Sequence, residues 1–446
     1  MTALARLLGL RDLVMLILAA VIGSGIFLVP SAIMGLVGGS VGAAMLVWLA
    51  GGVLSLLGAL TYGELSAMKP RAGGLYVYIR DCFGALPAFL FGWTLFFAIA
   101  SGSVATLAVA FSDNLSAVIP MSATAARLVS VGMIVVVAAV NVRGTRQSAD
   151  VQNVTTAIKV ALIVVMSGAL FWFGRGFIDD GTPLWPARLD LSFFSAIGMA
   201  MIAVLWAYEG WQYATYSAGE TVDSQRNYPR AFLFGTLAVV VLYFLANLAY
   251  LAAIGPAEVA RSKSVAADAV AATAGPGAAR LVALAIAVSI FSAGNAITLS
   301  ASRVYYAMAG DGLFFRKLAE VHPRFGTPAF AVLAGAAWAA LLSLTGTFQQ
   351  LLTYVVFCGW IFYGLGSACV FVYRRRIPAD QLPYRVPGYP WTPMLFTAAA
   401  GMLVVNTLVS RLMSEPLRTT LALGIIILGI PAYFLWKRGL TRRLIP

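Results

Sequence analysis

Charged residues are scarce in this chain, and histidine and cysteine are almost absent. Only 11% of the 446 residues are charged and 61% are hydrophobic, whereas an ordinary soluble domain is about 25% charged. So few charges cannot cover a surface that faces water, and we expect lipid to surround most of the protein. With one histidine, His322, and three cysteines, the composition indicates neither a multi-histidine metal site nor a disulfide framework. We expect no cofactor.

The positive charge that remains is distributed unevenly. The formal net charge is +13, which in a soluble protein would suggest nucleic acid as a partner. If the N-terminus lies in the cytoplasm, 21 of the 30 lysines and arginines fall in cytoplasmic segments and 8 in outer segments. The positive-inside rule then predicts a multi-pass protein with both termini cytoplasmic and no nucleic-acid partner. We expect the membrane to be a bacterial inner membrane.

Long apolar runs occur twelve times. A helix needs roughly 20 apolar residues to cross a bilayer, so we predict an all-α integral membrane protein that forms a single unit over 1–446. The predicted spans are 12–36, 42–66, 84–114, 124–141, 150–174, 192–219, 230–254, 278–308, 328–345, 349–373, 392–412 and 417–436.

Two of these spans contain residues that weaken a helix in the middle of the membrane. The first has Gly-Ser-Gly at 23–25, and each glycine costs a helix about 1 kcal/mol relative to alanine. The sixth has Glu209 beside Gly210, and a charge at the bilayer centre costs about 2.5–3.5 kcal/mol, so Glu209 should face a cavity. The alternatives are close helix packing through small residues at 23–25 and a structural ion pair or protonated carboxyl at Glu209.

The two weak points are five helices apart, which favours two inverted repeats with a binding site at their interface. We predict the first repeat at 11–176 and the second at 192–376, with two extra helices and a cytoplasmic tail at 390–446. Helices 1 and 6 should be unwound at mid-membrane.

The broken helices predict a zwitterionic ligand, because half-helix N-termini attract a carboxylate and free carbonyls attract a cation. The predicted carboxylate site comprises Gly23, Ser24, Gly25 and Ile26. The predicted amino-group site comprises the carbonyls of Ile22, Trp206, Ala207 and Glu209. The side chain of the ligand should meet Trp206, Tyr208, Glu209 and Gly210, with Trp206 as a gate.

Ordered motifs resemble the amino acid–polyamine–organocation superfamily and, within it, bacterial relatives of the L-type amino acid transporters. They are Gly23-Ser24-Gly25-Ile26-Phe27 with Pro30, Tyr62-Gly63-Glu64-Leu65, Gly73-Gly74-Leu75-Tyr76, Asn141-Val142-Arg143-Gly144, Ala207-Tyr208-Glu209-Gly210-Trp211, Gly219-Glu220 with Asn227-Tyr228-Pro229-Arg230, and Ser302-Arg303 with Gly310-Asp311-Gly312.

The resemblance implies the five-plus-five inverted-repeat fold and alternating-access transport of L-amino acids. It also gives Lys159, deep in the fifth span, a role: many sodium-independent members have a lysine where a sodium ion sits in coupled relatives. Eukaryotic light chains bond a heavy subunit through a cysteine in the loop that corresponds to 113–124. That loop has no cysteine here, so we expect no disulfide-linked heavy subunit; the oligomeric state stays open.

Neutral substrates are expected, with tolerance of cationic or polar ones because of Glu209. Exchange and proton symport both stay open, and a polyamine or other organocation carrier of the same fold is the nearest alternative. A membrane-embedded enzyme would need a nucleophile, metal ligands or paired acids at membrane depth. A channel would need rings of polar residues along a pore. Glu64, which has Lys69 and Arg71 close by, is interpreted as part of a structural ion pair.

Overall fold

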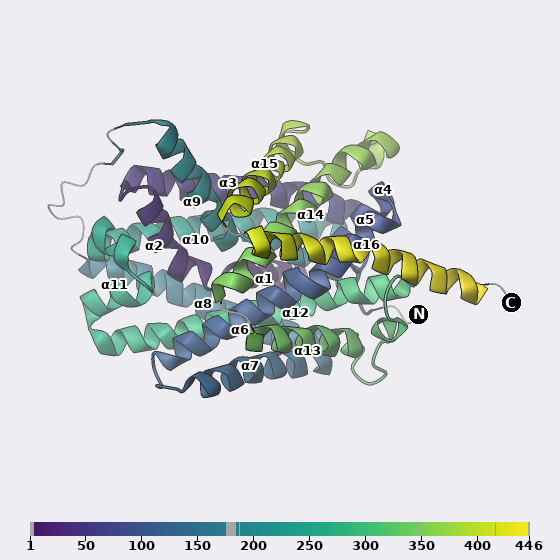
Figure 1. Ribbon diagram of the computed structural model, residues 1–446, viewed down its shortest axis with the longest axis horizontal. Helices are drawn as coiled ribbons and strands as arrows, with labels where there is room; N and C mark the ends of the chain where they lie inside the picture. Colours follow the sequence, from purple (N-terminus) through teal and green to yellow (C-terminus); the bar gives the residue numbers. More distant parts are fainter. Residues whose placement is uncertain (1–3, 175–183, 187, 346–347, 415, 445–446) are drawn as a thin grey trace.

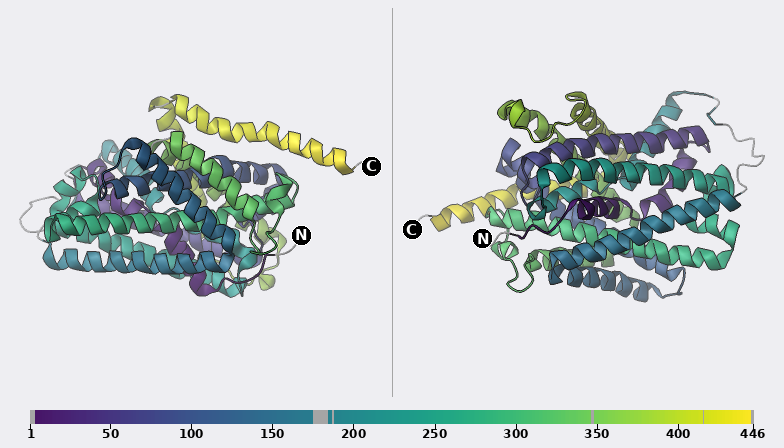
Figure 2. Two further views of the ribbon diagram at one scale, coloured as in Figure 1. Left: turned by 90° about the horizontal axis from the view of Figure 1, so that it is seen from below. Right: turned by 180° about the vertical axis from the view of Figure 1, so that it is seen from behind.

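The helices of this protein run mostly side by side along its long axis. The computed structural model describes residues 4–174, 184–186, 188–345, 348–414 and 416–444. Within these ranges the one β-type pairing is a bridge between Leu8 and Thr221. Both termini lie at the same end of the molecule, and α16 lies along the outer edge of the bundle (Figures 1 and 2).

The first half of the chain contains one interrupted helix, α1 followed by α2, and a π-helical turn, η1. Its elements are α1 (Leu10–Val21), α2 (Gly25–Leu36), α3 (Val41–Met68), α4 (Leu75–Phe83), α5 (Ala85–Thr94), η1 (Leu95–Ile99), α6 (Ala100–Ser116), α7 (Ala123–Arg143) and α8 (Thr145–Phe173).

The second half also contains an interrupted helix, α9, which continues as the 3₁₀ segment η2. Its elements are α9 (Leu191–Ala207), η2 (Trp211–Glu220), α10 (Ser224–Arg261), α11 (Val265–Ala274), α12 (Pro276–Gly310), η3 (Arg316–Ala319), α13 (Ala329–Thr345), α14 (Phe348–Arg376), η4 (Ala379–Gln381), α15 (Trp391–Ser414) and α16 (Pro416–Leu444).

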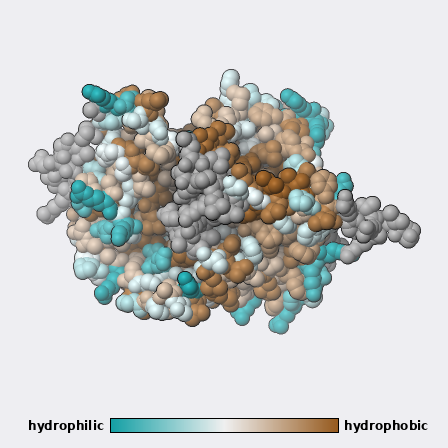
Figure 3. Space-filling model, viewed as in Figure 1, coloured by the Kyte–Doolittle hydropathy of each residue, from teal (hydrophilic) through white to brown (hydrophobic). Residues whose placement is uncertain are grey.

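Eight helices of the described chain are long and apolar enough to cross a membrane, and the bent pair α1–α2 makes a ninth. Apolar side chains also face outward: Trp172 is 83% exposed and Leu191 86%. Figure 3 shows apolar residues over much of one face, with hydrophilic residues mostly near its margins. An outer surface of this kind requires lipid as its solvent, which confirms the prediction of an all-helical, multi-pass membrane protein.

Short elements outside the apolar runs were not predicted. The helices α4 and α11 have 9 and 10 residues, too few to cross a bilayer, and so hydropathy does not reveal them. The helix α10 continues beyond the predicted end at residue 254 to Arg261, past a non-helical Gly255 with φ of 72°.

Glu64 belongs to an ion pair, but its partner is not the neighbour that the sequence suggested. Its two carboxylate oxygens accept hydrogen bonds from Nε and Nη2 of Arg374 on α14, both at 2.7 Å. The backbone amide of Val386 donates to the same carboxylate at 2.6 Å. Lys69 and Arg71 are near Glu64 in sequence, whereas the fold brings the C-terminal end of α14 onto α3.

A second, fully buried ion pair joins α12, η2 and α8. Nε and Nη2 of Arg303 donate to the Glu220 carboxylate at 2.6 and 3.1 Å. The Thr145 hydroxyl donates to Glu220 Oε1 at 2.8 Å and accepts from Arg303 Nη2 at 2.9 Å. The backbone carbonyl of Glu220 also accepts the amides of Leu7 and Leu8. The charges of Arg303 and Glu220 compensate each other in this buried pair. The C-terminal end of η2 is therefore fixed to α12 and α8.

Replacing Glu220 should therefore destabilise the whole bundle. In Glu220→Gln, Arg303 becomes a buried cation without a counter-charge, which costs about 3–5 kcal/mol. We expect the thermal midpoint, measured by fluorescence-detected size exclusion in detergent, to fall clearly below that of the unsubstituted protein. The matched control is Glu258→Gln, whose exposed pair with Arg261 contributes about 0–1 kcal/mol. Equal midpoints for the two variants would contradict this role of Glu220.

Candidate functional site

The break between α1 and α2 leaves peptide donors free. The helix α1 ends at Val21, α2 begins at Gly25, and the two are bent by 45°. The backbone amides of Ser24, Gly25 and Ile26 have no backbone or side-chain acceptor in the part of the chain that the structure describes. They form the N-terminus of α2, where the helix dipole adds partial positive charge.

The break after α9 lies directly against the first. The helix α9 ends at Ala207, residues 208–210 form a turn, and η2 follows. Gly210 has φ of 129°, and a Cβ atom there would lie 2.5 Å from the carbonyl oxygen of Ala20. A Cβ atom on Gly25 would lie 2.8 Å from the Cα atom of Ala207. Only glycine permits backbones to approach this closely, so the glycines bring the two breaks into contact.

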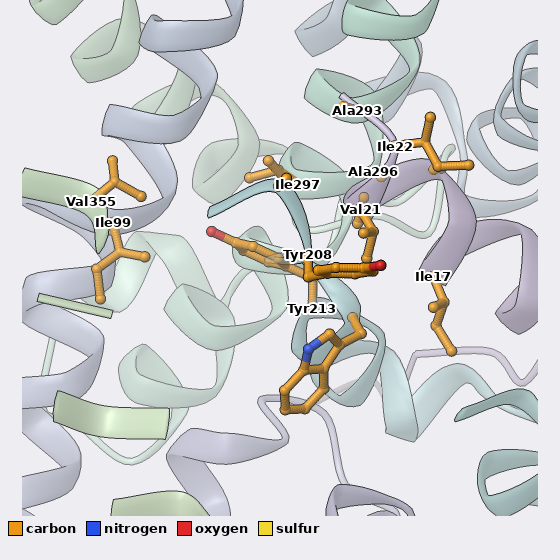
Figure 4. Close-up of a cluster of buried hydrophobic side chains, with 14 of the residues drawn as sticks. Ile17, Val21, Ile22, Ile99, Tyr208, Tyr213, Ala293, Ala296, Ile297 and Val355 are labelled. Carbon is orange, nitrogen blue, oxygen red and sulfur yellow. The ribbon is translucent and has the colours of Figure 1, made fainter. Parts of the chain in front are cut away.

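A small cavity opens where the breaks meet. Its volume is about 30 Å³, room for roughly two water molecules, so a larger ligand requires the surrounding helices to move apart. Figure 4 shows part of its wall, with Val21 of α1 and Ala293 and Ile297 of α12 near Tyr213. The lining residues are Ala20, Val21, Gly23, Ser24, Gly25, Ser103, Leu107, Trp206, Glu209, Gly210, Tyr213, Ala293 and Ile297.

Three polar side-chain atoms at this cavity have no partner among the described residues. They are Ser24 Oγ, Glu209 Oε2 and the Tyr213 hydroxyl, all inaccessible to solvent. Buried polar groups are normally hydrogen-bonded. An occupant of the cavity that carries both donors and acceptors would satisfy all three.

Glu209 keeps one carboxylate oxygen available. The Tyr363 hydroxyl of α14 donates to Glu209 Oε1 at 2.8 Å, while Oε2 has no described partner. No ion pair within the described ranges includes Glu209. The alternative of a structural ion pair is therefore not supported, and the free oxygen belongs to the cavity.

Lys159 lies on the opposite side of the first break from the free amides. The side chain is fully buried on α8, and Nζ donates to the carbonyls of Ala19 at 2.9 Å, Ile22 at 2.6 Å and Ser289 at 3.4 Å. Two of these carbonyls lie at or just beyond the C-terminus of α1, where the helix dipole is negative. The Lys159 amino group thus donates hydrogen bonds to carbonyls at the end of α1 that the break exposes.

Three residues predicted to bind the carboxylate or amino group already have hydrogen-bond partners within the protein. The Ile22 carbonyl accepts from Lys159 and from the Ser289 hydroxyl at 3.1 Å, so it already has two donors without a ligand. The Gly23 amide donates to the Val21 carbonyl at 2.9 Å, so Gly23 lines the cavity without offering a donor. The Trp206 carbonyl accepts from the Glu209 amide at 3.1 Å.

Tyr208 does not line the cavity, contrary to the prediction that it covers the ligand. Its ring packs against Trp48, with centroids 5.9 Å apart, and against Tyr243 at 5.1 Å. The turn after Ala207 directs this side chain away from the site, whereas its neighbours Trp206 and Glu209 remain in the wall.

Other wall residues were missed by the sequence analysis. Ser103 and Leu107 come from α6, and Ala293 and Ile297 from α12. Apolar residues within apolar helices give no signal that separates a cavity wall from a lipid-facing surface. Tyr213 could have been predicted from the sequence, because it lies three residues after Gly210 and therefore close to the second break.

Comparison with known proteins finds a family model and relatives that match nearly the whole chain. The family model described as amino acid permease matches residues 8–430. The serine/threonine exchanger SteT of Bacillus subtilis is 30% identical over 441 residues, which are 98% of this chain and 98% of the relative.

Mammalian transporters are similar to the same extent. The b(0,+)-type amino acid transporter 1 of Mus musculus is 30% identical over 99% of this chain and 91% of its own length. The large neutral amino acids transporter small subunit 2 of Mus musculus is 31% identical over 97% and 81%. These relatives are transporters rather than enzymes, and the chain belongs to the amino acid permease family.

Proposed function

We propose that this protein is a sodium-independent exchanger of L-amino acids that works by alternating access. The observation that carries the proposal is the row of free amides at the start of α2, beside a cavity that also holds the unpaired oxygen of Glu209. A zwitterion presents a carboxylate and an ammonium group a few bonds apart, and such a pair matches the opposite polarities on the two sides of the cavity.

Twelve spans follow if α13, α14 and α16 cross the membrane in addition to the nine apolar spans. Five spans then form the repeat at 11–176, five the repeat at 192–376, and α15 and α16 the remainder. An even number of spans agrees with both termini at one end of the bundle (Figure 1). We propose that this end faces the cytoplasm of a bacterial cell, under the inner membrane, an orientation that the lysine and arginine distribution supports.

The ligand would lie across the two breaks. Its carboxylate would accept from the amides of Ser24, Gly25 and Ile26 and from the Ser24 hydroxyl. Its ammonium group would meet the carbonyls of Ala207 and Glu209, with Trp206 as the gate. Glu209 Oε2 would bind a cationic or polar side chain, so the substrates would be neutral amino acids and some cationic ones.

Lys159 would replace the sodium ion of coupled carriers. Its amino group donates to the carbonyls at the end of α1 and, when protonated, would supply there the positive charge that a bound cation otherwise provides. The site then has no need of an external ion to hold the break in shape.

Exchange is favoured over proton symport by the relative SteT, which is named a serine/threonine exchanger. A polyamine carrier is the second candidate. It is disfavoured because free amides at a helix N-terminus are suited to a carboxylate, which polyamines lack. The segment between α6 and α7 has no cysteine, and we propose that the chain works without a disulfide-linked subunit.

Counterflow in proteoliposomes tests this function. Vesicles filled with an unlabelled neutral amino acid should take up labelled amino acid many times faster than empty ones, because an exchanger reorients only when loaded. Uptake into empty vesicles that is driven by a proton gradient would indicate symport instead. Uptake of a decarboxylated amine in preference to the amino acid would indicate the polyamine carrier.

Sodium dependence tests the role of Lys159. We expect exchange to be unchanged when choline replaces Na⁺ on both sides of the membrane at constant pH, because the ammonium group of Lys159 already occupies the cation position. The readout is the initial rate of labelled amino acid uptake. A rate that collapses without Na⁺ would refute this role.

Substitution of Glu209 tests side-chain recognition. In Glu209→Gln the cavity keeps its shape and loses its negative charge, so inhibition by a cationic amino acid should weaken about tenfold, or 1.4 kcal/mol. Inhibition by a neutral amino acid of similar length should change little. The measurement is the half-inhibitory concentration of each competitor against labelled neutral substrate, with Glu258→Gln as a surface control. Equal profiles for Glu209→Gln and the unsubstituted protein would rule out this role.

A further inference from the structure

Two of the three cysteines lie side by side where α4 meets α14. Cys82 Sγ donates to the carbonyl of Cys369 at 3.8 Å, and Cys369 Sγ donates to the carbonyl of Leu365 at 3.5 Å. Residues 287 positions apart in sequence are thus brought into contact. Cys358, which lies earlier on α14 and is buried, takes no part in this contact.

The surroundings of Cys82 make it the more reactive thiol of the pair. It is partly exposed, whereas Cys369 is fully buried. The contact with Cys369 and the nearby Arg376 guanidinium lower the pKa of Cys82, against the opposing effects of burial and of Asp81. Because the thiolate is the nucleophile, a partly exposed cysteine with a lowered pKa beside a second thiol has the features of a redox-sensitive site.

We propose that Cys82 and Cys369 form a reversible dithiol–disulfide site that responds to peroxide. The Cys82 thiolate attacks a peroxide oxygen, giving a sulfenic acid and releasing hydroxide or the corresponding alkoxide. The Cys369 thiol then displaces the hydroxyl group, so the disulfide forms and water leaves. With hydrogen peroxide, two thiols and one peroxide give one disulfide and two waters. A cellular dithiol reverses the step by exchange.

The disulfide would link two elements that support the cavity from different sides. The loop before α4 contacts η2, because the Gly73 amide donates to the Tyr216 carbonyl at 2.9 Å and a Cβ atom on Gly74 would lie 2.4 Å from the Thr215 carbonyl. The helix α14 holds Glu209 through Tyr363.

In the part of the chain that the structure describes, hydrogen bonds from Tyr373 and Arg376 of α14 to Asp81 of α4 also join the two helices at this end. The Tyr373 hydroxyl donates to Asp81 Oδ2 at 3.3 Å, and Arg376 Nη1 donates to the Asp81 carbonyl at 2.8 Å. Hydrogen bonds of this kind can be exchanged for water as elements move, whereas a disulfide cannot. Oxidation should therefore hinder the opening of the small cavity, a consequence that rests on the proposed transport function.

The experiment treats the purified protein in proteoliposomes with hydrogen peroxide and measures two things. Mass spectrometry of proteolytic peptides should show a Cys82–Cys369 disulfide, which disappears on addition of dithiothreitol. Exchange should slow about tenfold, as expected when a conformational step is hindered, and should recover with the same reductant. The first measurement does not depend on transport, so it tests the thiol pair even if the proposed function fails.

Three variants complete the design. Cys82→Ser and Cys369→Ser should each retain exchange and lose its sensitivity to peroxide, whereas Cys358→Ser should remain as sensitive as the unsubstituted protein. Absence of the cross-linked peptide would overturn the proposal, as would a complete disulfide that leaves the exchange rate unchanged. If either serine variant fails to fold, the peptide measurement and the Cys358→Ser comparison still decide.

Discussion

The contact between Lys159 and the end of α1 is the interaction on which the site depends. A helix interrupted inside a membrane exposes carbonyls on one side of the break and amides on the other, and hydrocarbon satisfies neither. The buried amino group of Lys159 donates hydrogen bonds to the carbonyls of Ala19 and Ile22. The amides of Ser24, Gly25 and Ile26 are then the groups left unsatisfied. The protein thus stabilises half of the break itself, and we propose that a ligand satisfies the other half.

The second break limits what that ligand can be. Glycines at positions 25 and 210 let α2 and the turn after α9 touch the neighbouring backbone, so Glu209 faces the same small space as the free amides. The Tyr363 hydroxyl fixes one oxygen of this carboxylate and leaves the other for the cavity. A donor row for a carboxylate and an acceptor for a cation are therefore combined in one place. An elongated organocation without a carboxylate would leave the amides unsatisfied.

Hydropathy predicted the helices well because each span must satisfy its own peptide groups and expose apolar side chains to lipid. It missed α4 and α11, which are too short to span, and it could not show that Glu64 pairs with Arg374. The candidate site was predicted in outline from Gly-Ser-Gly, Glu209 and Lys159. The partners of Ile22 and Tyr208, namely Lys159 and Ser289 for the one and Trp48 and Tyr243 for the other, were not predicted. The direction of a side chain or carbonyl beside a break depends on the local turn and on partners from distant helices. The walls supplied by α6 and α12 carry no distinguishing residue type and emerge only from the packing.

The most direct measurement is an experimental structure of the protein with a bound amino acid, at a resolution that places its carboxylate. We predict carboxylate oxygens within about 2.7–3.2 Å of the amide nitrogens of residues 24–26. Lys159 should remain hydrogen-bonded to the carbonyls at the end of α1. A carboxylate bound elsewhere, or a continuous helix through residues 22–26, would contradict it.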